Sequence, residues 1–216
     1  MRRAGAPRVS DMLAILLLLG GAYLSGSIPT GVWLSLRHGV DPRDIGSGNI
    51  GATNVARAAG VPTGLLTLAG DLLKGLLPVL VATRAGHAEP IVALTALAAF
   101  IGHLYSCFLG FEGGKGVATA LGVFLGLAPL AMAMVVPLFL TTVALSRYVS
   151  LASLLAAAVT PGLLLLLGYG RPTLVVALTI SALIVLRHRD NIRRMRFGTE
   201  ARVGAARPSG ADSETA

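Results

Sequence analysis

Residues 117–186 read VATALGVFLGLAPLAMAMVVPLFLTTVALSRYVSLASLLAAAVTPGLLLLLGYGRPTLVVALTISALIVL, an apolar stretch whose charged residues are Arg147 and Arg171. A membrane-spanning helix needs about 20 apolar residues, so this stretch is long enough for several crossings. Pro129, the Arg147-Tyr148 pair and the sequence around Arg171 divide it. We therefore predict apolar helices over 117–128, 130–146, 151–167 and 173–186, of which the first is short and either tilted or partial.

Three further apolar stretches precede it, at residues 12–36, 61–83 and 91–109. The first follows a basic start and resembles a signal peptide, but it continues past Ile28-Pro29 without a small-x-small cleavage site. We interpret it as a retained transmembrane helix with a proline bend. The chain is therefore predicted to be an all-α integral membrane protein of about seven transmembrane helices, some of them short or broken.

The composition agrees with a membrane protein and excludes an ordinary soluble domain. Hydrophobic residues make up 54% of the chain, charged residues only 13%, and the mean hydropathy is +0.76. The net charge is +8, and the positive residues concentrate outside the apolar stretches, where lipid headgroups are the expected partner, so no nucleic-acid partner is predicted. The expected organisation is an N-terminal extension (1–11), a single transmembrane domain (12–200) and a disordered C-terminal tail (201–216).

Arginines decide the expected orientation of the chain in the membrane. The densest basic cluster follows Leu186 and contains Arg187, Arg189, Arg193, Arg194, Arg196, Arg202 and Arg207. Because basic segments stay in the cytoplasm, the C-terminus is predicted to be cytoplasmic and, after about seven crossings, the N-terminus to be outside. The smaller basic group at the N-terminus argues for the reverse, and consists of Arg2, Arg3 and Arg8.

Three polar segments interrupt the apolar pattern, and the predicted topology puts all of them on the cytoplasmic side. The asparagine segment (residues 46–54) reads GSGNIGATN, the lysine segment (113–119) reads GGKGVAT, and the histidine segment (187–192) reads RHRDNI. Backbone amides of glycines, together with Lys and Arg side chains, are the groups that bind phosphate. The sequence therefore predicts that a phosphorylated substrate binds at this surface.

Each segment also has a simpler interpretation. The asparagine segment could form a turn before a helix, although Arg57 one helical turn beyond it favours a binding site. The lysine segment lacks the spacing of a nucleotide-binding P-loop, yet glycine amides and the Lys115 ammonium at a helix start still make an anion site. His188 and Asn191 would share one helical face, but a basic helix lying on anionic lipid explains the histidine segment equally well.

Other classes of protein stay open on the residues alone. Asp71 and Lys74, three residues apart inside an apolar stretch, suit either a functional site or an internal ion pair. Broken helices and charges at membrane depth also suit a transporter of a phosphorylated solute, which should show internal repeats, whereas the three polar segments share no pattern. A non-catalytic lipid-binding scaffold would leave the polar segments unexplained.

In their order and spacing, the polar segments resemble those of the bacterial acyl-phosphate-dependent glycerol-3-phosphate acyltransferase family. The similarity extends over about residues 26–200 and includes GSIP (26–29), DLLKG (71–75), GH (102–103), RYVSLAS (147–153) and GTE (198–200). It implies a seven-helix enzyme of the bacterial inner membrane with an external N-terminus and a cytoplasmic active site. The implied reaction moves a fatty acyl group from acyl phosphate to glycerol 3-phosphate, giving lysophosphatidic acid and phosphate for phospholipid biosynthesis.

With this resemblance, the candidate residues take expected roles. One substrate phosphate is expected to bind the lysine segment at Gly113, Gly114, Lys115, Gly116 and Thr119. The second phosphate or the acyl carbonyl is expected to bind Ser47, Asn49, Thr53, Asn54 and Arg57. The resemblance adds Ser153 to the catalytic residues, with His188 and Asn191 orienting the glycerol hydroxyl, whose proton goes either to His188 or to a substrate phosphate. No metal and no cofactor are expected, because phosphate is already a good leaving group.

Overall fold

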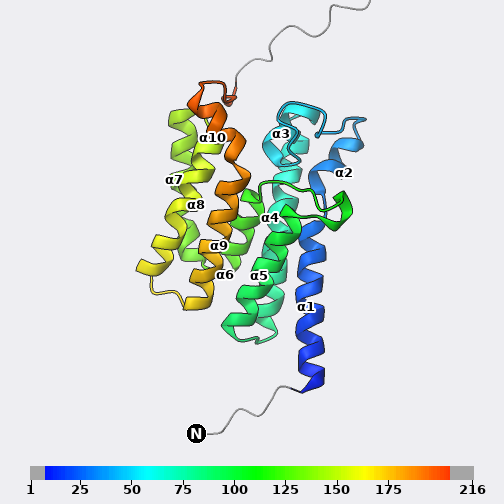
Figure 1. The fold of residues 1–216 in the computed structure, drawn as a ribbon, viewed down its shortest axis with the longest axis vertical. Helices are drawn as coiled ribbons and strands as arrows, with labels where there is room; N and C mark the ends of the chain where they lie inside the picture. Colours follow the sequence, from blue (N-terminus) through cyan, green and yellow to red (C-terminus); the bar gives the residue numbers. More distant parts are fainter. Residues whose placement is uncertain (1–7, 205–216) are drawn as a thin grey trace, which may run out of the picture.

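The computed structural model describes residues 8–204, and within them the chain is all-helical, as predicted. The remaining parts of the predicted N-terminal extension and C-terminal tail, residues 1–7 and 205–216, lie outside the described residues, and the first helix already begins inside that extension. The elements in Figure 1 are α1 (Val9–Ser27), α2 (Thr30–Leu36), α3 (Ala52–Ala59), α4 (Val61–Arg84), α5 (Glu89–Leu104), a 3-10 turn (Cys107–Leu109), α6 (Val117–Leu127), α7 (Pro129–Ser146), α8 (Val149–Leu166), α9 (Arg171–Arg187) and α10 (Arg189–Arg196).

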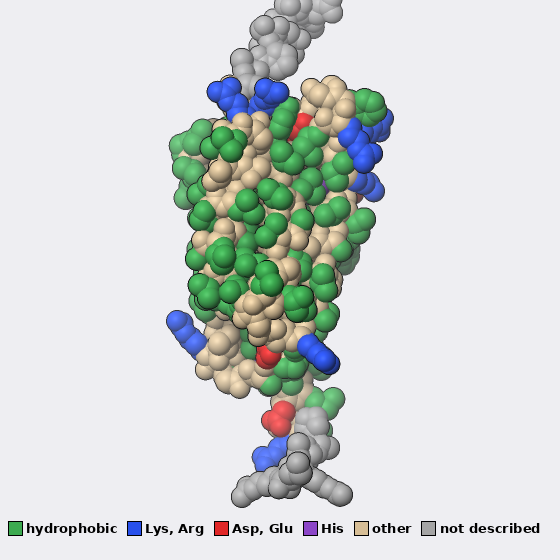
Figure 2. Space-filling view, turned by 90° about the vertical axis from the view of Figure 1, so that its left-hand side faces the viewer, with side chains coloured by type: hydrophobic (Ala, Val, Ile, Leu, Met, Phe, Trp, Pro, Cys, Tyr) green, Lys and Arg blue, Asp and Glu red, His purple; other side chains and the backbone are tan. Residues whose placement is uncertain are grey.

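The described helices include enough apolar spans for a multi-pass membrane protein. By length and composition, five segments can cross a membrane, namely Val9–Leu36, Val61–Arg84, Glu89–Leu109, Pro129–Ser146 and Val149–Leu166. The bent pair of α9 and α10 makes a sixth if it is one span, and α6 is a shorter apolar helix of 11 residues. Figure 2 shows hydrophobic side chains over the middle of the molecule and basic ones towards its two ends. The prediction of a membrane protein with short and broken helices is confirmed.

The first span breaks at Pro29, as its sequence predicted. Pro29 has no N–H to donate, and it separates α1 from α2. The carbonyl oxygen of Ile28 at the break accepts a hydrogen bond from Lys74 Nζ at 2.8 Å. Lys74 also pairs with Asp71 at 2.8 Å, so these two intramembrane charges form the internal ion pair that the sequence allowed.

The helices form two groups with α6 between them (Figure 1). Helices α1 to α5 make up one group, and helices α7 to α10 make up the other. The hydrophobic core draws on both groups, since Phe100 and Leu104 of α5, Leu164 of α8 and Ile180 of α9 are all buried. This arrangement leaves space between the groups on the side where the polar segments lie.

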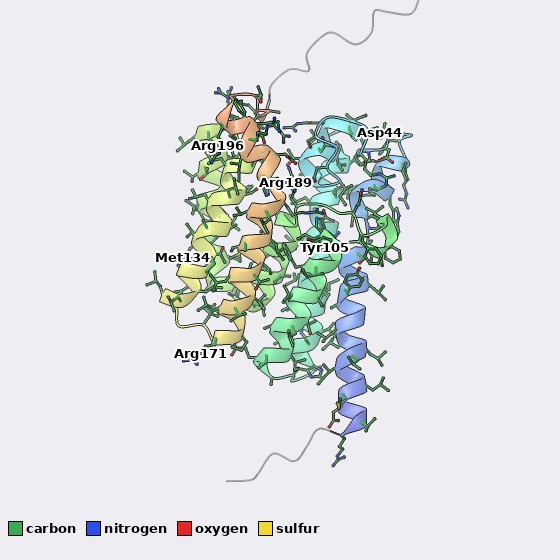
Figure 3. All side chains as sticks on the ribbon, in the orientation of Figure 1. Asp44, Tyr105, Met134, Arg171, Arg189 and Arg196 are labelled. Atoms are coloured by element: carbon green, nitrogen blue, oxygen red, sulfur yellow. The ribbon has the colours of Figure 1, made fainter. Side chains whose placement is uncertain are left out.

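The polar segments face one end of the bundle, where α3 and α10 lie. Figure 3 shows Arg189 at this end and Arg171 at the opposite one. The histidine segment is not one continuous helix there, because α9 ends at Arg187, α10 begins two residues later, and the two helices are bent by 53°. The expectation that His188 and Asn191 share a face of a single helix is therefore wrong, since the bend occurs at His188 itself.

Candidate active site

A cavity of about 1260 Å³ lies between the two helix groups and is lined by residues of all three polar segments. Most of the predicted site residues line it: Ser47, Asn49, Thr53, Asn54, Arg57, Lys115, Gly116, Ser153, His188 and Asn191. Within the described part of the chain, the remaining three do not, namely Gly113, Gly114 and Thr119. Deeper in the bundle the lining is mostly apolar and comes from α6, α7, α8 and α9. The cavity therefore joins a polar mouth to an apolar interior.

Asn54 organises the asparagine segment from the first turn of α3. Its Oδ1 accepts the Ser47 N–H at 3.0 Å, and its Nδ2 donates to the carbonyl oxygens of Pro42 at 2.8 Å and Ile45 at 2.9 Å. The Asn54 side chain is buried, with 2% of the residue exposed. Because backbone groups engage both ends of its amide, Asn54 shapes the loop, whereas the sequence predicted that it would contact substrate.

Other polar side chains of the same region face the cavity mouth. Ser47, Thr53 and Arg57 are exposed lining residues, with Arg57 in the last turn of α3. Asn49 is half-buried, and its Oδ1 accepts the Gly51 N–H at 2.8 Å, which leaves the Nδ2 group of Asn49 as a donor. A guanidinium next to hydroxyl and amide donors is suited to binding a phosphate.

Arg187 holds the lysine segment against the end of α5. Its guanidinium donates to the carbonyl oxygens of Leu104 at 2.7 Å, Gly113 at 3.0 Å and Gly114 at 3.1 Å. The Gly114 N–H in turn donates to the carbonyl oxygen of His103 at 3.2 Å. A Cβ at Gly113 would collide with that same carbonyl oxygen, and one at Gly114 would collide with the His103 ring. The structure gives these two glycines a packing role, and their binding of a substrate phosphate stays a prediction.

A chain of hydrogen bonds connects Lys115 to α10 and to the segment that follows it. Lys115 Nζ donates to Asn191 Oδ1 at 2.5 Å, Asn191 Nδ2 donates to Glu200 Oε1 at 2.6 Å, and Arg194 Nε donates to Glu200 Oε2 at 2.7 Å. Burial lowers the pKa of Lys115 to about 8. Burial alone would raise the pKa of Glu200, but the hydrogen bonds from Asn191 and Arg194 outweigh it and hold that pKa below its usual value.

His188 lies at the bend between α9 and α10 and lines the cavity, although only 2% of it is exposed. Its Nδ1 lies 2.8 Å from the carbonyl oxygen of Ile184. A carbonyl oxygen can only accept, so Nδ1 carries the proton and Nε2 of the neutral ring keeps its lone pair. Ser153 on α8 is also buried, and its hydroxyl donates to the carbonyl oxygen of Val149 at 2.8 Å.

Sequence reasoning assigned no role at the site to four other residues that line the cavity: Asp71, His103, Arg194 and Glu200. Glu200 lies in the GTE motif, and this motif could have indicated that Glu200 belongs to the site. The hydrogen bond between Glu200 and Asn191 was not predictable from their spacing in the sequence. Nothing local indicates that His103 Nδ1 lies 3.9 Å from the Asp71 carboxylate. The predicted residue Thr119 is instead fully buried where α6 packs closely on α4.

The glycerol-3-phosphate acyltransferase family model matches residues 15–198. Relatives named glycerol-3-phosphate acyltransferase include proteins of Geobacter sulfurreducens, 55% identical, and Geobacter metallireducens, 57% identical, each over 90% of this chain and 100% of the relative. Two crystal structures of PlsY (YgiH), an integral membrane glycerol 3-phosphate acyltransferase, are similar at 43% identity over 88% of this chain and 96% of that one. The TM-score is 0.86 for its glycerol 3-phosphate form and 0.83 for its lysophosphatidic acid form. The chain therefore belongs to the glycerol-3-phosphate acyltransferase family, and to the membrane-embedded kind that PlsY represents.

Proposed function

We propose that the protein transfers a fatty acyl group from acyl phosphate to glycerol 3-phosphate, producing lysophosphatidic acid and inorganic phosphate. The observation that carries this proposal is the cavity, which joins phosphate-binding groups at its mouth to an apolar interior. Such a cavity is suited to two small phosphate groups and one acyl chain. The glycerol 3-phosphate and lysophosphatidic acid forms of PlsY support the acceptor and the product.

The two phosphates bind two different groups of donors in this proposal. Lys115 supplies an ammonium next to Gly116, whose left-handed backbone (φ 81°) starts α6. Arg57 supplies a guanidinium near the hydroxyls of Ser47 and Thr53, all of which line the mouth. Because the donors of the two groups are different residues, alanine variants at Lys115 and Arg57 should raise the KM of different substrates.

The proposed reaction is a direct transfer that needs one proton acceptor. The glycerol hydroxyl attacks the acyl carbonyl carbon, the new C–O bond forms, and the bond to the leaving phosphate breaks. The hydroxyl proton goes either to His188 Nε2 or to a phosphate oxygen of a substrate. A general base contributes roughly a hundredfold to ten-thousandfold in rate, so His188→Gln should lose that factor in kcat only if His188 is the base. Asn191 then orients the reacting groups through the Lys115 ammonium that it binds, and Ser153 does so through the lone pairs of its hydroxyl oxygen.

The proposed location is the bacterial inner membrane, with the cavity mouth facing the cytoplasm and the N-terminus outside. Arginines at the mouth end include Arg37 and Arg147 with the exposed arginines of α10, whereas Arg8, Arg84 and Arg171 lie near the opposite helix ends. An excess of basic residues marks the cytoplasmic side of a membrane protein.

Cysteine labelling in intact cells tests this orientation. In a Cys107→Ser background, cysteines replacing Ser47, Glu112 or Thr199 should be protected from an impermeant thiol reagent added outside. A cysteine replacing His87, in the loop between α4 and α5, should be labelled. Labelling of any of the first three from outside would contradict a single cytoplasmic site.

The direct test of the reaction uses the purified protein in detergent. With palmitoyl phosphate and glycerol 3-phosphate together, we expect phosphate release and an equal amount of lysophosphatidic acid, and with either substrate alone we expect neither. Movement of glycerol 3-phosphate into liposomes with no product formed would instead identify a transporter. Absence of product with every acyl phosphate tried would overturn the proposal.

A further inference from the structure

Arg194 is a cation of the cavity wall to which the two proposed phosphate sites give no role. It lies on α10, whose first and last residues, Arg189 and Arg196, are labelled in Figure 3. Its Nε donates to Glu200 Oε2 at 2.7 Å, and within residues 8–204 its two Nη groups have no hydrogen-bond partner. A guanidinium that is held through Nε keeps its Nη groups as donors, and such donors bind phosphate well.

Glu200 holds the Arg194 guanidinium in one place. The Glu200 side chain is buried, with 8% exposed, whereas 36% of the Arg194 side chain is exposed. Glu200 is itself fixed, because its Oε1 accepts the bond from Asn191, which in turn binds Lys115. This chain of hydrogen bonds therefore has a cation at each end and a single carboxylate between them. Together the four side chains carry a net positive charge, which favours an anion at this wall.

The charges of Lys115 and Arg194 act on each other, so the two cations lie near one another. Burial is the main reason why the pKa of Lys115 falls to about 8, and the Arg194 charge lowers this pKa further. Two cations that repel each other are both stabilised when an anion binds between them. The other titratable side chains that face Lys115 are Glu200 and Asp190, which raise its pKa, Arg57, which lowers it, and His188.

We propose that Arg194 is a further phosphate-binding residue, that its Nη groups bind the same substrate phosphate as Lys115, and that Glu200 positions it. The proposal rests on the proposed function and adds one cation to one of its two phosphate sites. Acyl phosphate and glycerol 3-phosphate both carry a phosphate group. The substrate whose KM changes will therefore identify which of them binds here.

Steady-state kinetics of Arg194→Met, with each substrate varied in turn, test the proposal, and Arg193→Met is the matched control. Arg193 precedes Arg194 on α10, is exposed and lies outside the cavity lining, so both variants change the net charge equally. Arg194→Met should raise the KM of the substrate that Lys115→Ala affects by about tenfold, because one charge-assisted contact is lost. Arg193→Met should stay within twofold of wild type. Arg194→Lys should fall between them, because lysine keeps the charge but lacks the fork of donors.

Glu200→Gln separates phosphate binding from a structural role of the ion pair. It removes the ion pair but keeps the Arg194 charge, so its KM should rise less than that of Arg194→Met, whereas a purely structural pair predicts equal rises. A shared phosphate also predicts opposite changes in pH dependence. The midpoint of the KM profile should move up in Arg194→Met and down in Glu200→Gln, because the Arg194 charge lowers the pKa of Lys115 and the Glu200 charge raises it.

Unfolding temperatures show whether each variant is folded. If Arg194→Met is not, the double variant Arg194→Met/Glu200→Gln leaves neither charge of the pair behind and should show the same rise in KM, while Arg194→Lys keeps the ion pair. A KM no higher than that of Arg193→Met in a folded variant would overturn the role of Arg194. A rise only in the KM that Arg57→Ala raises would overturn the phosphate shared with Lys115. Absence of product with the wild type would instead overturn the proposed function.

Discussion

The asparagine and lysine segments are both rich in glycine and both reach the cavity, but the protein holds them in opposite ways. Asn54 fixes the asparagine segment through three backbone groups that lie no more than 12 residues away in the chain. The lysine segment is fixed from a distance, because Arg187 binds the Gly114 carbonyl 73 residues away and Asn191 binds Lys115 76 residues away.

Two polar segments of similar composition can therefore place their polar side chains at the cavity either by local or by tertiary contacts. In the asparagine segment the local bonds leave Ser47 and Thr53 exposed at the mouth. In the lysine segment the glycines allow packing on α5, and the Lys115 side chain reaches the cavity, where it binds Asn191. Because Arg187 also connects α9 to α5, we expect damage to the lysine segment to cost more activity than damage to the asparagine segment.

Removing the guanidinium of Arg187 should cause the largest loss of activity. Arg187→Leu leaves three part-buried carbonyl groups without their donor, at about 1–3 kcal/mol each, and lets the lysine segment move. A displacement of about 1 Å at a catalytic group can cost on the order of a hundredfold, which is the loss expected in kcat/KM. Arg189→Leu, at an exposed position two residues on, is the control and should stay within twofold of wild type on steady-state kinetics. If Arg187→Leu also kept kcat/KM within twofold of wild type, activity would not depend on the long-range contacts that hold the lysine segment.

Removing the Lys115 ammonium should have the next largest effect. Lys115→Ala loses one charge-assisted contact to phosphate, worth about 1.5–3 kcal/mol, so the KM of one phosphorylated substrate should rise about tenfold to a hundredfold. Steady-state kinetics with each substrate varied in turn would show which of the two it is. Unchanged KM values for both substrates would show that Lys115 does not bind a substrate phosphate.

The asparagine segment offers a matched pair of substitutions with a smaller expected effect. Asn54→Asp removes the Nδ2 donor and sets a carboxylate against the carbonyl groups of Pro42 and Ile45, so both the unfolding temperature and the activity should fall. Asn49→Asp keeps the acceptor that the Gly51 N–H needs, so its unfolding temperature should match the wild type. Equal unfolding temperatures for the two variants would show that Asn54 does not organise the segment.

A change of pH should alter substrate affinity less than any of these substitutions alters activity. Burial lowers the pKa of Lys115 to about 8, so its ammonium is present below that pH and is lost as the pH rises through it. The affinity for the phosphate bound there should therefore fall about fourfold between about pH 7 and 8.5. A Lys115→Arg variant that still turns over should show no such fall, because a guanidinium stays charged. A flat KM profile in the wild type would contradict the assigned role of the ammonium.

The sequence predicted the features that depend on neighbours in the chain. The lengths of the apolar stretches predicted the helices, Pro29 predicted the break after α1, and most of the site residues predicted from the polar segments do line the cavity. It could not predict the three carbonyl groups that Arg187 binds, because that contact joins segments far apart in the chain. The bend at His188 also escaped prediction, since neither proline nor glycine marks it, and Glu200 gained its role only from its contact with Asn191.

In the proposed function, two compact phosphate sites and an apolar interior select acyl phosphate as the donor. The most direct measurement offers the purified protein palmitoyl phosphate or palmitoyl-CoA in turn, each with glycerol 3-phosphate, and quantifies lysophosphatidic acid. We expect product from palmitoyl phosphate and little or none from palmitoyl-CoA. Comparable turnover with palmitoyl-CoA, under conditions where acyl phosphate cannot form, would contradict it.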